Sequence, residues 1–398
     1  MPKPTVLISG AGIAGPALAF WLAKGGYHVV VVELADGIRP GGQTVDLRGA
    51  GRAVVERMGL LQQMRERSLD QRGIAWVKSD GRRAAEMPVD AFHGNGMVSQ
   101  LEILRGDLAG VLYAATATDV EYRFGTRIAE VAQSDDPLDD PAVATLSDGS
   151  TVSADLIVGA DGPHSAVRRL VFGPEETFVR PLGGYHAWFT APDTVGLDGW
   201  YLMYQAPGGL NASMRPSHDP AVAKASLAFR SGPLQYDRSN LDEQRELLTA
   251  RFAGAGWQCD ELIAAAREAD DFYFDAFAQV HMDSWSSGRV ALVGDAGYCA
   301  SPLSGMGTSL ALVGAYVLAG ELVAGPLPDA LKRYETVMRP YVDRCQKLPN
   351  GIDGYVPESA SDIRINALVM KYMQRWPFRP VAERLWFKTA EAVQLPDY

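Results

Sequence analysis

Three glycines and one acid near the N-terminus have the spacing of a nucleotide-binding turn. Gly10, Gly12 and Gly15 follow the β-forming run Val6 to Ile8, and Glu33 ends a second such run. The first glycine permits a tight turn, the second lets the backbone approach a pyrophosphate, and the third lets a helix pack against a strand. The positive end of that helix attracts phosphates, and a carboxylate at the end of the second strand accepts from ribose hydroxyls. These residues predict a dinucleotide site.

The cofactor-binding residues predicted from this stretch are Gly10, Gly12, Ala14, Gly15 and Glu33. A 2′-phosphate would prefer an arginine at the position of Glu33, so the acid favours FAD or NAD over NADP in this site. The alternative is a purely structural turn, because glycine-rich turns are common in α/β proteins.

Strand-like and helical segments alternate around these residues, which predicts an α/β fold with a Rossmann-like nucleotide domain and an inserted β-sheet domain. We expect the nucleotide domain over 1–172 and 272–340, the β-sheet substrate domain over 173–271, and a C-terminal helical segment over 341–398. Aromatic residues concentrate in the inserted region. We interpret most of them as sheet core and the remainder as able to face a flat ligand.

Five local predictions bear on the site. Residues 74–87 form a hairpin around Asp80-Gly81, and residues 272–279 form a strand; both are assigned to the nucleotide domain. Residues 99–116 form an amphipathic helix with Arg105 near its first turns, as a solvated or a phosphate-directed residue. Two of the C-terminal helices are predicted at 361–375 and 379–393.

Composition excludes several classes of protein. The formal net charge of −11 argues against a nucleic-acid partner. Three distant cysteines without a C-x-x-C argue against a disulfide reductase and favour a reducing, cytoplasmic location. Glycines interrupt both the apolar N-terminus and the apolar run 310–324, so neither a signal peptide nor a membrane span is predicted. The six histidines show no metal-ligand spacing, so no metal site is predicted and the histidines are interpreted as structural.

Two later motifs extend the first one. They are Asp161-Gly162-Pro163-His164-Ser165-Ala166-Val167-Arg168, and Gly294-Asp295-Ala296 followed by Pro302, Gly305 and Gly307. In this order the three motifs resemble the class A FAD-dependent monooxygenases, the para-hydroxybenzoate hydroxylase-like aromatic hydroxylases. The middle motif matches the family's D-G-x-x-S-x-x-R pattern at every fixed position, and the resemblance runs from Thr5 to about Met338.

The resemblance implies further cofactor contacts. Asp295 would accept from ribityl hydroxyls of FAD, and the turn that contains Pro302, Gly305 and Gly307 would face the flavin's pyrimidine edge with the positive end of a helix. Arg105 matches a family arginine that contacts FAD. Three further residues are assigned through the family segment in which they lie. Asp161 lies in a segment linked to the binding of FAD and of the nicotinamide cofactor, and Arg168 would hold that segment in place or contact a pyrophosphate. Arg48 matches a region near the isoalloxazine ring.

The implied activity is NAD(P)H-dependent hydroxylation of an aromatic or polyketide-like small molecule through a flavin C4a-hydroperoxide. FAD is the resident cofactor, NAD(P)H a transient reductant and O₂ the co-substrate, so the chemistry is flavin-centred and no catalytic side chain is assigned. The C-terminal helices resemble those of the tetracycline-inactivating, polyketide-modifying branch. The chain is expected to be a monomer or homodimer. Two alternatives stay open: a flavin-dependent reductase or dehydrogenase without oxygen insertion, and a non-catalytic flavin- or drug-binding protein.

Overall fold

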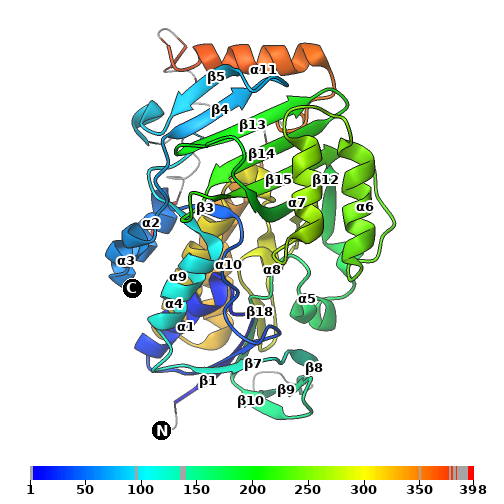
Figure 1. Cartoon of the computed structure of the whole chain (residues 1–398). Coiled ribbons are helices and arrows are strands. Elements are labelled where there is room, and N and C mark those ends of the chain that lie inside the picture. The colour runs from blue at the N-terminus through cyan, green and yellow to red at the C-terminus, as the bar shows by residue number, and fades with distance from the viewer. Residues whose placement is uncertain are drawn as a thin grey trace.

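Two large sheets dominate the fold, one above the other in Figure 1. The computed structural model describes residues 3–94, 97–134, 140–348, 351–375, 378–379, 382 and 393–398. The lower sheet is mainly parallel, the upper sheet is mainly antiparallel, and the chain passes between them several times. This is the α/β architecture that the sequence predicted.

The six-stranded parallel sheet carries the N-terminal glycine turn. Its order is β17 (Ser286–Ser287), β18 (Val290–Leu292), β11 (Leu156–Gly159), β1 (Thr5–Ser9), β2 (His28–Glu33) and β7 (Glu121–Phe124), with only β17 antiparallel to its neighbour. β1 lies at the centre, where Ile8 pairs with Val158 on one side and Val31 on the other. Its residues are buried on both faces, as expected of a covered parallel strand. The carboxyl ends of these strands, where ligands bind in such sheets, point toward the upper sheet.

Helix α9 (Gly307–Ala324) is the central helix of this half. It packs against α1 (Ala14–Lys24), α2 (Gly49–Met58) and α10 (Leu327–Cys345). Its length and composition would suffice to cross a membrane, but 83% of the apolar window is buried inside the protein. The helix therefore has the packing of a core helix, as the sequence predicted. Close contact with α2 requires glycine, since a Cβ on Gly51 would lie 2.7 Å from the Ser309 Oγ.

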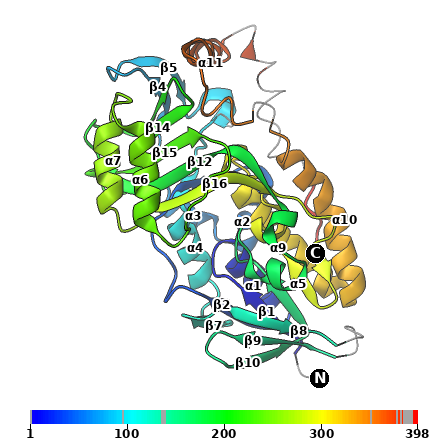
Figure 2. The ribbon, with the colours of Figure 1, turned by 90° about the vertical axis from the view of Figure 1, so that its right-hand side faces the viewer.

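The seven-stranded sheet forms the upper half. Its order is β16 (Tyr273–Val280), β12 (Val179–Pro192), β15 (Val222–Arg230), β14 (Leu210–Pro216), β13 (Trp200–Ala206), β4 (Gly73–Val77) and β5 (Arg83–Pro88). Helices α6 (Leu241–Phe252) and α7 (Cys259–Glu268) cover one of its faces (Figure 2). Four alternate residues of β15 belong to the apolar core beneath these helices: Ala223, Ala225, Leu227 and Phe229. The residues between them, Lys224 and Ser226, therefore face the opposite side of the sheet.

This sheet order corrects two assignments made from sequence. The hairpin around Asp80-Gly81 and the strand at 272–279 form as predicted, but β4, β5 and β16 join the upper sheet and not the nucleotide domain. Position along the chain misled the prediction, because β4 pairs with β13, more than a hundred residues later.

A third correction concerns the helix predicted over 99–116. Its first part is a strand, β6 (Glu102–Leu104), paired with β3 (Thr44–Asp46), so helix α4 (Arg105–Ala114) begins at Arg105 itself. Pairing with a distant partner overrides the local helical spacing of Leu101 and Leu104.

The remaining elements are short. They are α3 (Leu61–Glu66), η1 (Ala91–Gly94), α5 (Ala166–Val171), η2 (Glu175–Thr177), α8 (Asp295–Tyr298), η3 (Pro302–Ser304) and the small sheet β8 (Ile128–Ala132), β9 (Ala142–Leu146) and β10 (Thr151–Ala154). Helix α11 (Ala360–Tyr372) lies over β5 and β13 at the top of Figure 1. Most of the helix predicted at 379–393 lies outside the described residues.

Candidate functional site

One cavity of about 1,870 Å³ extends from the N-terminal glycine turn to the upper sheet. All predicted site residues except Gly15 and Arg168 line it: Gly10, Gly12, Ala14, Glu33, Arg48, Arg105, Asp161, Asp295, Pro302, Gly305 and Gly307. Ligand pockets usually measure about 300–1,000 Å³, so this cavity has room for more than one small molecule.

The glycine turn is tightly packed on one side and open on the other. A Cβ on Gly15 would lie 1.9 Å from the Gly10 carbonyl oxygen, and one on Gly10 would lie 2.6 Å from the oxygen of Ala160. A Cβ on Gly12 would meet nothing within 4 Å, because this residue faces the cavity. No side chain of the described chain caps the start of α1 at Ile13, so its first N–H groups remain available to an anion.

Glu33 joins the end of β2 to this turn. Its Oε2 accepts from the Ala11 N–H at 2.8 Å, and its Oε1 accepts from the Ala35 N–H at 3.0 Å. The carboxylate is thereby fixed at the cavity wall, and each oxygen keeps a second lone pair for a ligand hydroxyl.

A second helix start opens on the same cavity. Gly294 has a φ of 67°, and a Cβ there would lie 3.2 Å from the Cβ of Ala14, so the turn after β18 packs on the start of α1. Asp295 follows it, and burial raises the pKa of this carboxyl. Its Oδ1 lies 3.9 Å from where Gly307 would place a Cβ. Within the described residues no side chain caps α9 at Met306, so the half-buried Asp295 lies beside a second set of free N–H groups.

Arg105 lies at the cavity wall without an ion-pair partner in the described parts of the chain. It is enclosed by the loop before β3, where a Cβ on Gly42 would lie 3.2 Å from its Nε. Burial, and then the neighbouring charge of Arg39, lower its pKa. Arg48 differs, since it pairs with Asp46 at 2.5 Å just before α2. Arg105 is therefore the desolvated cation that an anionic ligand would neutralise.

Asp161 and Arg168 hold their own segment together. The Asp161 Oδ2 accepts from the N–H groups of Ala166 at 2.9 Å and Val167 at 3.2 Å, which stabilises the start of α5. The Arg168 guanidinium is buried and donates to the carbonyl oxygens of Ala296 at 2.9 Å and Pro163 at 2.5 Å. These contacts attach the Asp161–Arg168 segment to the turn after β18. Of the two roles predicted for Arg168, holding the segment or contacting a pyrophosphate, the structure shows contacts for the first.

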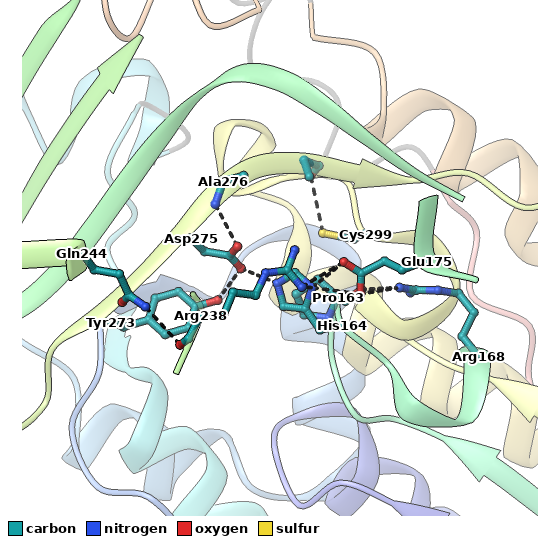
Figure 3. A network of polar contacts seen from close by, with 11 residues as sticks. Pro163, His164, Arg168, Glu175, Arg238, Gln244, Tyr273, Asp275, Ala276 and Cys299 are labelled. Atoms are coloured by element: carbon teal, nitrogen blue, oxygen red, sulfur yellow. Dashed lines mark hydrogen bonds and ion pairs between the residues drawn. The ribbon is translucent and has the colours of Figure 1, made fainter. Parts of the chain in front are cut away.

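His164, in the same segment, is the centre of an ionic cluster that the sequence did not predict (Figure 3). Its Nδ1 lies 3.1 Å from Glu175 and its Nε2 lies 2.8 Å from Asp275, while Arg238 donates to Glu175 at 3.0 Å. Burial opposes protonation of His164, but hydrogen bonds to Asp275 and Glu175 raise its pKa to about 9. Burial also opposes ionisation of both acids, but His164 lowers the pKa of each to about 2. The cluster joins the segment after β11 to β16 of the upper sheet.

The substitution His164→Gln is expected to weaken this junction in a pH-dependent manner. The folded pKa of His164 exceeds its unfolded value of about 6.5, so its contribution is complete below about pH 6.5 and is lost as pH rises through 9. The two acids contribute above about pH 4.5 and lose their contribution as pH falls toward 2. We expect a loss of about 1–2 kcal/mol in the free energy of unfolding between about pH 5 and 6.5 that narrows toward pH 9. Denaturant unfolding across this range measures it, and a difference independent of pH would contradict the assignment.

The cavity-facing side of the upper sheet carries four polar residues that were not assigned to the site from sequence, and two aromatic residues of the set from which some were expected to face a flat ligand. The residues are His186, Trp188, Tyr201, Arg215, Lys224 and Ser226. Arg215 stacks 3.9 Å from the ring centre of Tyr201 and donates to the Thr44 Oγ1 at 2.6 Å. Residues after α10 also reach the cavity, through Tyr355 and Met370. The alternation of small polar and apolar residues along β14 and β15 was the available signal.

These observations suit FAD. Two uncapped helix starts meet at one cavity, an acid ends β2 beside the first of them, a second, half-buried acid lies beside the other, and a desolvated arginine lies at the start of α4. A dinucleotide offers phosphates to the helix starts and the arginine, and ribose and ribityl hydroxyls to the two acids.

Comparison with known proteins agrees with this fit. The chain matches the FAD binding domain family over residues 3–345. It is 44% identical over 321 residues to an uncharacterized protein of Mycobacterium tuberculosis, covering 80% of this chain and 85% of that protein. It is 40% identical over 345 residues to a flavin-dependent monooxygenase of Legionella longbeachae, covering 86% and 87%.

A solved structure extends the similarity to the whole chain. The tetracycline destructase Tet(55) has 33% sequence identity and a TM-score of 0.83, with 100% of both chains covered. The order of elements around the cavity is therefore common to both proteins. This chain belongs to the FAD-binding-domain family and is a class A FAD-dependent monooxygenase.

Proposed function

We propose that this enzyme uses NAD(P)H to hydroxylate a planar, hydroxyl-bearing aromatic or polyketide-like molecule. The observation that carries the proposal is one continuous cavity, which runs from the FAD-side residues to the polar face of the upper sheet. The similarity to a tetracycline destructase over the full chain supports this substrate class. FAD, when reduced, supplies the reaction with O₂ that delivers one oxygen atom to the substrate.

The chain's own residues bind and orient in this proposal. The turn from Gly10 to Gly15 and Arg105 hold the pyrophosphate, and Glu33 holds the adenosine ribose. Asp295 would accept from the ribityl chain, while the start of α9 at Gly307 would offer its positive end to the flavin. Asp161 supports this arrangement through the start of α5.

The upper sheet and the residues after α10 close the substrate end. Trp188 and Tyr201 offer aromatic faces, and Met370 covers the cavity from α11. Their role is to exclude water and hold the substrate ring in line with the flavin. The cavity-facing row of polar residues explains why we propose a substrate that carries hydroxyl groups and not a plain hydrocarbon.

Substrate-stimulated NAD(P)H oxidation by the FAD-loaded protein tests the proposal. Phenols, naphthols, anthraquinones and tetracyclines are screened with NADH and NADPH under ¹⁸O₂, and products are weighed by mass spectrometry. We expect at least one compound to accelerate oxidation and to gain one labelled oxygen atom. The comparison of NADH with NADPH identifies the reductant.

Two results would count against it. Accelerated oxidation with hydrogen peroxide but no labelled product would favour a flavin-dependent reductase or dehydrogenase without oxygen insertion, which was one of the alternatives. Labelled product from compounds without aromatic or conjugated hydroxyl groups would contradict the substrate class.

A further inference from the structure

His186 is a buried imidazole whose ring nitrogens have no hydrogen-bond partner in the described chain. The residue is 2% exposed and lines the cavity. It lies on β12 between Tyr185 and Ala187, which belong to the core beneath α6 and α7, so its ring points to the other side, where the cavity lies. Buried polar groups are nearly always satisfied, and an exception at a cavity wall calls for an explanation.

The neighbouring polar residues keep most of their partners, although the Asn211 Oδ1 and the Ser226 Oγ also lack one, whereas His186 has no partner at either ring nitrogen in the described chain. In the same cross-strand row, Asn211 and Gln205 donate to the Tyr355 carbonyl oxygen at 2.9 and 3.0 Å. Asp275, which pairs with His186 across β12 and β16, uses its carboxylate for His164, for the Tyr273 hydroxyl at 2.7 Å and for the Ala276 N–H at 2.8 Å.

The aromatic rings around His186 and its protonation state indicate which kind of ligand it would bind. Its ring stacks on Phe277 at 4.5 Å between centroids and lies 4.1 Å from the Trp188 ring. Burial lowers the pKa of His186 to about 4, although the charge of Asp275 acts to raise it. The imidazole is therefore neutral and offers one donor and one acceptor. A hydroxyl group on a flat ring is complementary to both features.

We propose that His186 is a substrate-binding residue that hydrogen-bonds a hydroxyl group of a planar aromatic or polyketide-like substrate. The inference rests on the proposed function and names one recognition contact within it. A site that hydrogen-bonds a substrate hydroxyl discriminates against analogues lacking it, because its polar group is then left unpaired. His186 therefore contributes to specificity for hydroxylated rings, at a cost to the stability of the free protein.

Two variants of the holoenzyme test it. His186→Phe keeps the ring stacked on Phe277 and removes both nitrogens, and His186→Gln keeps a donor and an acceptor. The probes are tetracycline, 1-naphthol and 1-methoxynaphthalene, with binding followed by flavin fluorescence. We expect the Phe variant to bind the hydroxylated probes about tenfold more weakly and methoxynaphthalene with a smaller loss, because the ether oxygen can only accept, and the Gln variant to recover most of the loss. Equal binding of 1-naphthol by wild type and Phe variant would overturn the proposal.

Readouts without ligand separate this inference from the proposed function. If the nitrogens lack an internal partner, the Phe variant has a Tm equal to or above that of the wild type, and ¹⁵N shifts of His186 between pH 5 and 8 are those of a neutral ring free of hydrogen bonds. A lowered Tm or a hydrogen-bonded ring would overturn the inference whatever the probes do. If no probe binds the wild type, the proposed substrate class fails, and these two measurements decide the role of His186.

Discussion

The substitution Gly15→Ala is expected to abolish FAD binding and to lower the free energy of unfolding of the apoprotein by about 3 kcal/mol. The added methyl carbon would lie 1.9 Å from the Gly10 carbonyl oxygen, so either the start of α1 or the turn after β1 must move. Neither can move freely, because the turn is itself packed against Ala160. The helical preference of alanine over glycine, about 1 kcal/mol, is too small to offset this overlap. Denaturant unfolding of the apoprotein and FAD titration measure the two effects.

The matched control is Gly12→Ala, two positions after Gly10. Its methyl carbon would meet nothing within 4 Å, and its φ lies outside the left-handed region. We therefore expect an unchanged or slightly higher unfolding free energy for the apoprotein, together with a loss of at least about tenfold in FAD affinity, because the methyl group would fill the space that faces the cavity. Equal loss of stability in both variants would show that the two glycines do not have the separate roles assigned to them.

Local chemistry accounts for what the sequence predicted well. The glycine turn, the acid at the end of β2 and the turn before α9 each depend on residues close together in the chain, and all of them line one cavity apart from Gly15.

Features that depend on distant pairing were not predictable in the same way. The start of α4 at Arg105 is set by β3, whose residue Thr44 pairs with Leu104 sixty positions away. The ionic cluster draws His164, Glu175 and Asp275 from three separate segments, and no local spacing brings them together. The histidines were interpreted as structural, which suits His164 but leaves His186 unexplained.

The assignment of residues to the two faces of the upper sheet was also not predictable from local sequence. Its aromatic residues were interpreted mainly as core, and Tyr185, Phe189 and Phe229 do lie beneath α6 and α7. Which alternate set turns to the helices cannot be read from β12 alone, because both of its alternate sets contain aromatic residues. The cavity-facing set, with Trp188 and His186, is assigned only once the helices are in place.

Arg105→Met is expected to weaken FAD binding by about 100-fold while leaving the apoprotein as stable as the wild type or more stable. The guanidinium is desolvated, lies near Arg39, and has no ion-pair partner within the described ranges, so it costs stability until an anion binds. Methionine keeps the length and much of the volume of the side chain without the charge. FAD titration of the apoprotein and denaturant unfolding without FAD measure the two opposite effects.

Arg39→Met is the control for charge alone. Its side chain is 69% exposed and lies 3.9 Å from Glu33, so the charge is screened by solvent and partly paired. We expect FAD affinity to change by less than about threefold in this variant, and the change to vanish at high salt. If Arg105→Met instead lowered the stability of the apoprotein, the arginine would have a structural partner in the free protein, and its assignment to the pyrophosphate would fail. Arg105→Met and Arg39→Met remove the same charge from neighbouring positions. A larger loss of FAD affinity in Arg105→Met would therefore be due to the burial of Arg105 and its lack of an ion-pair partner within the described ranges.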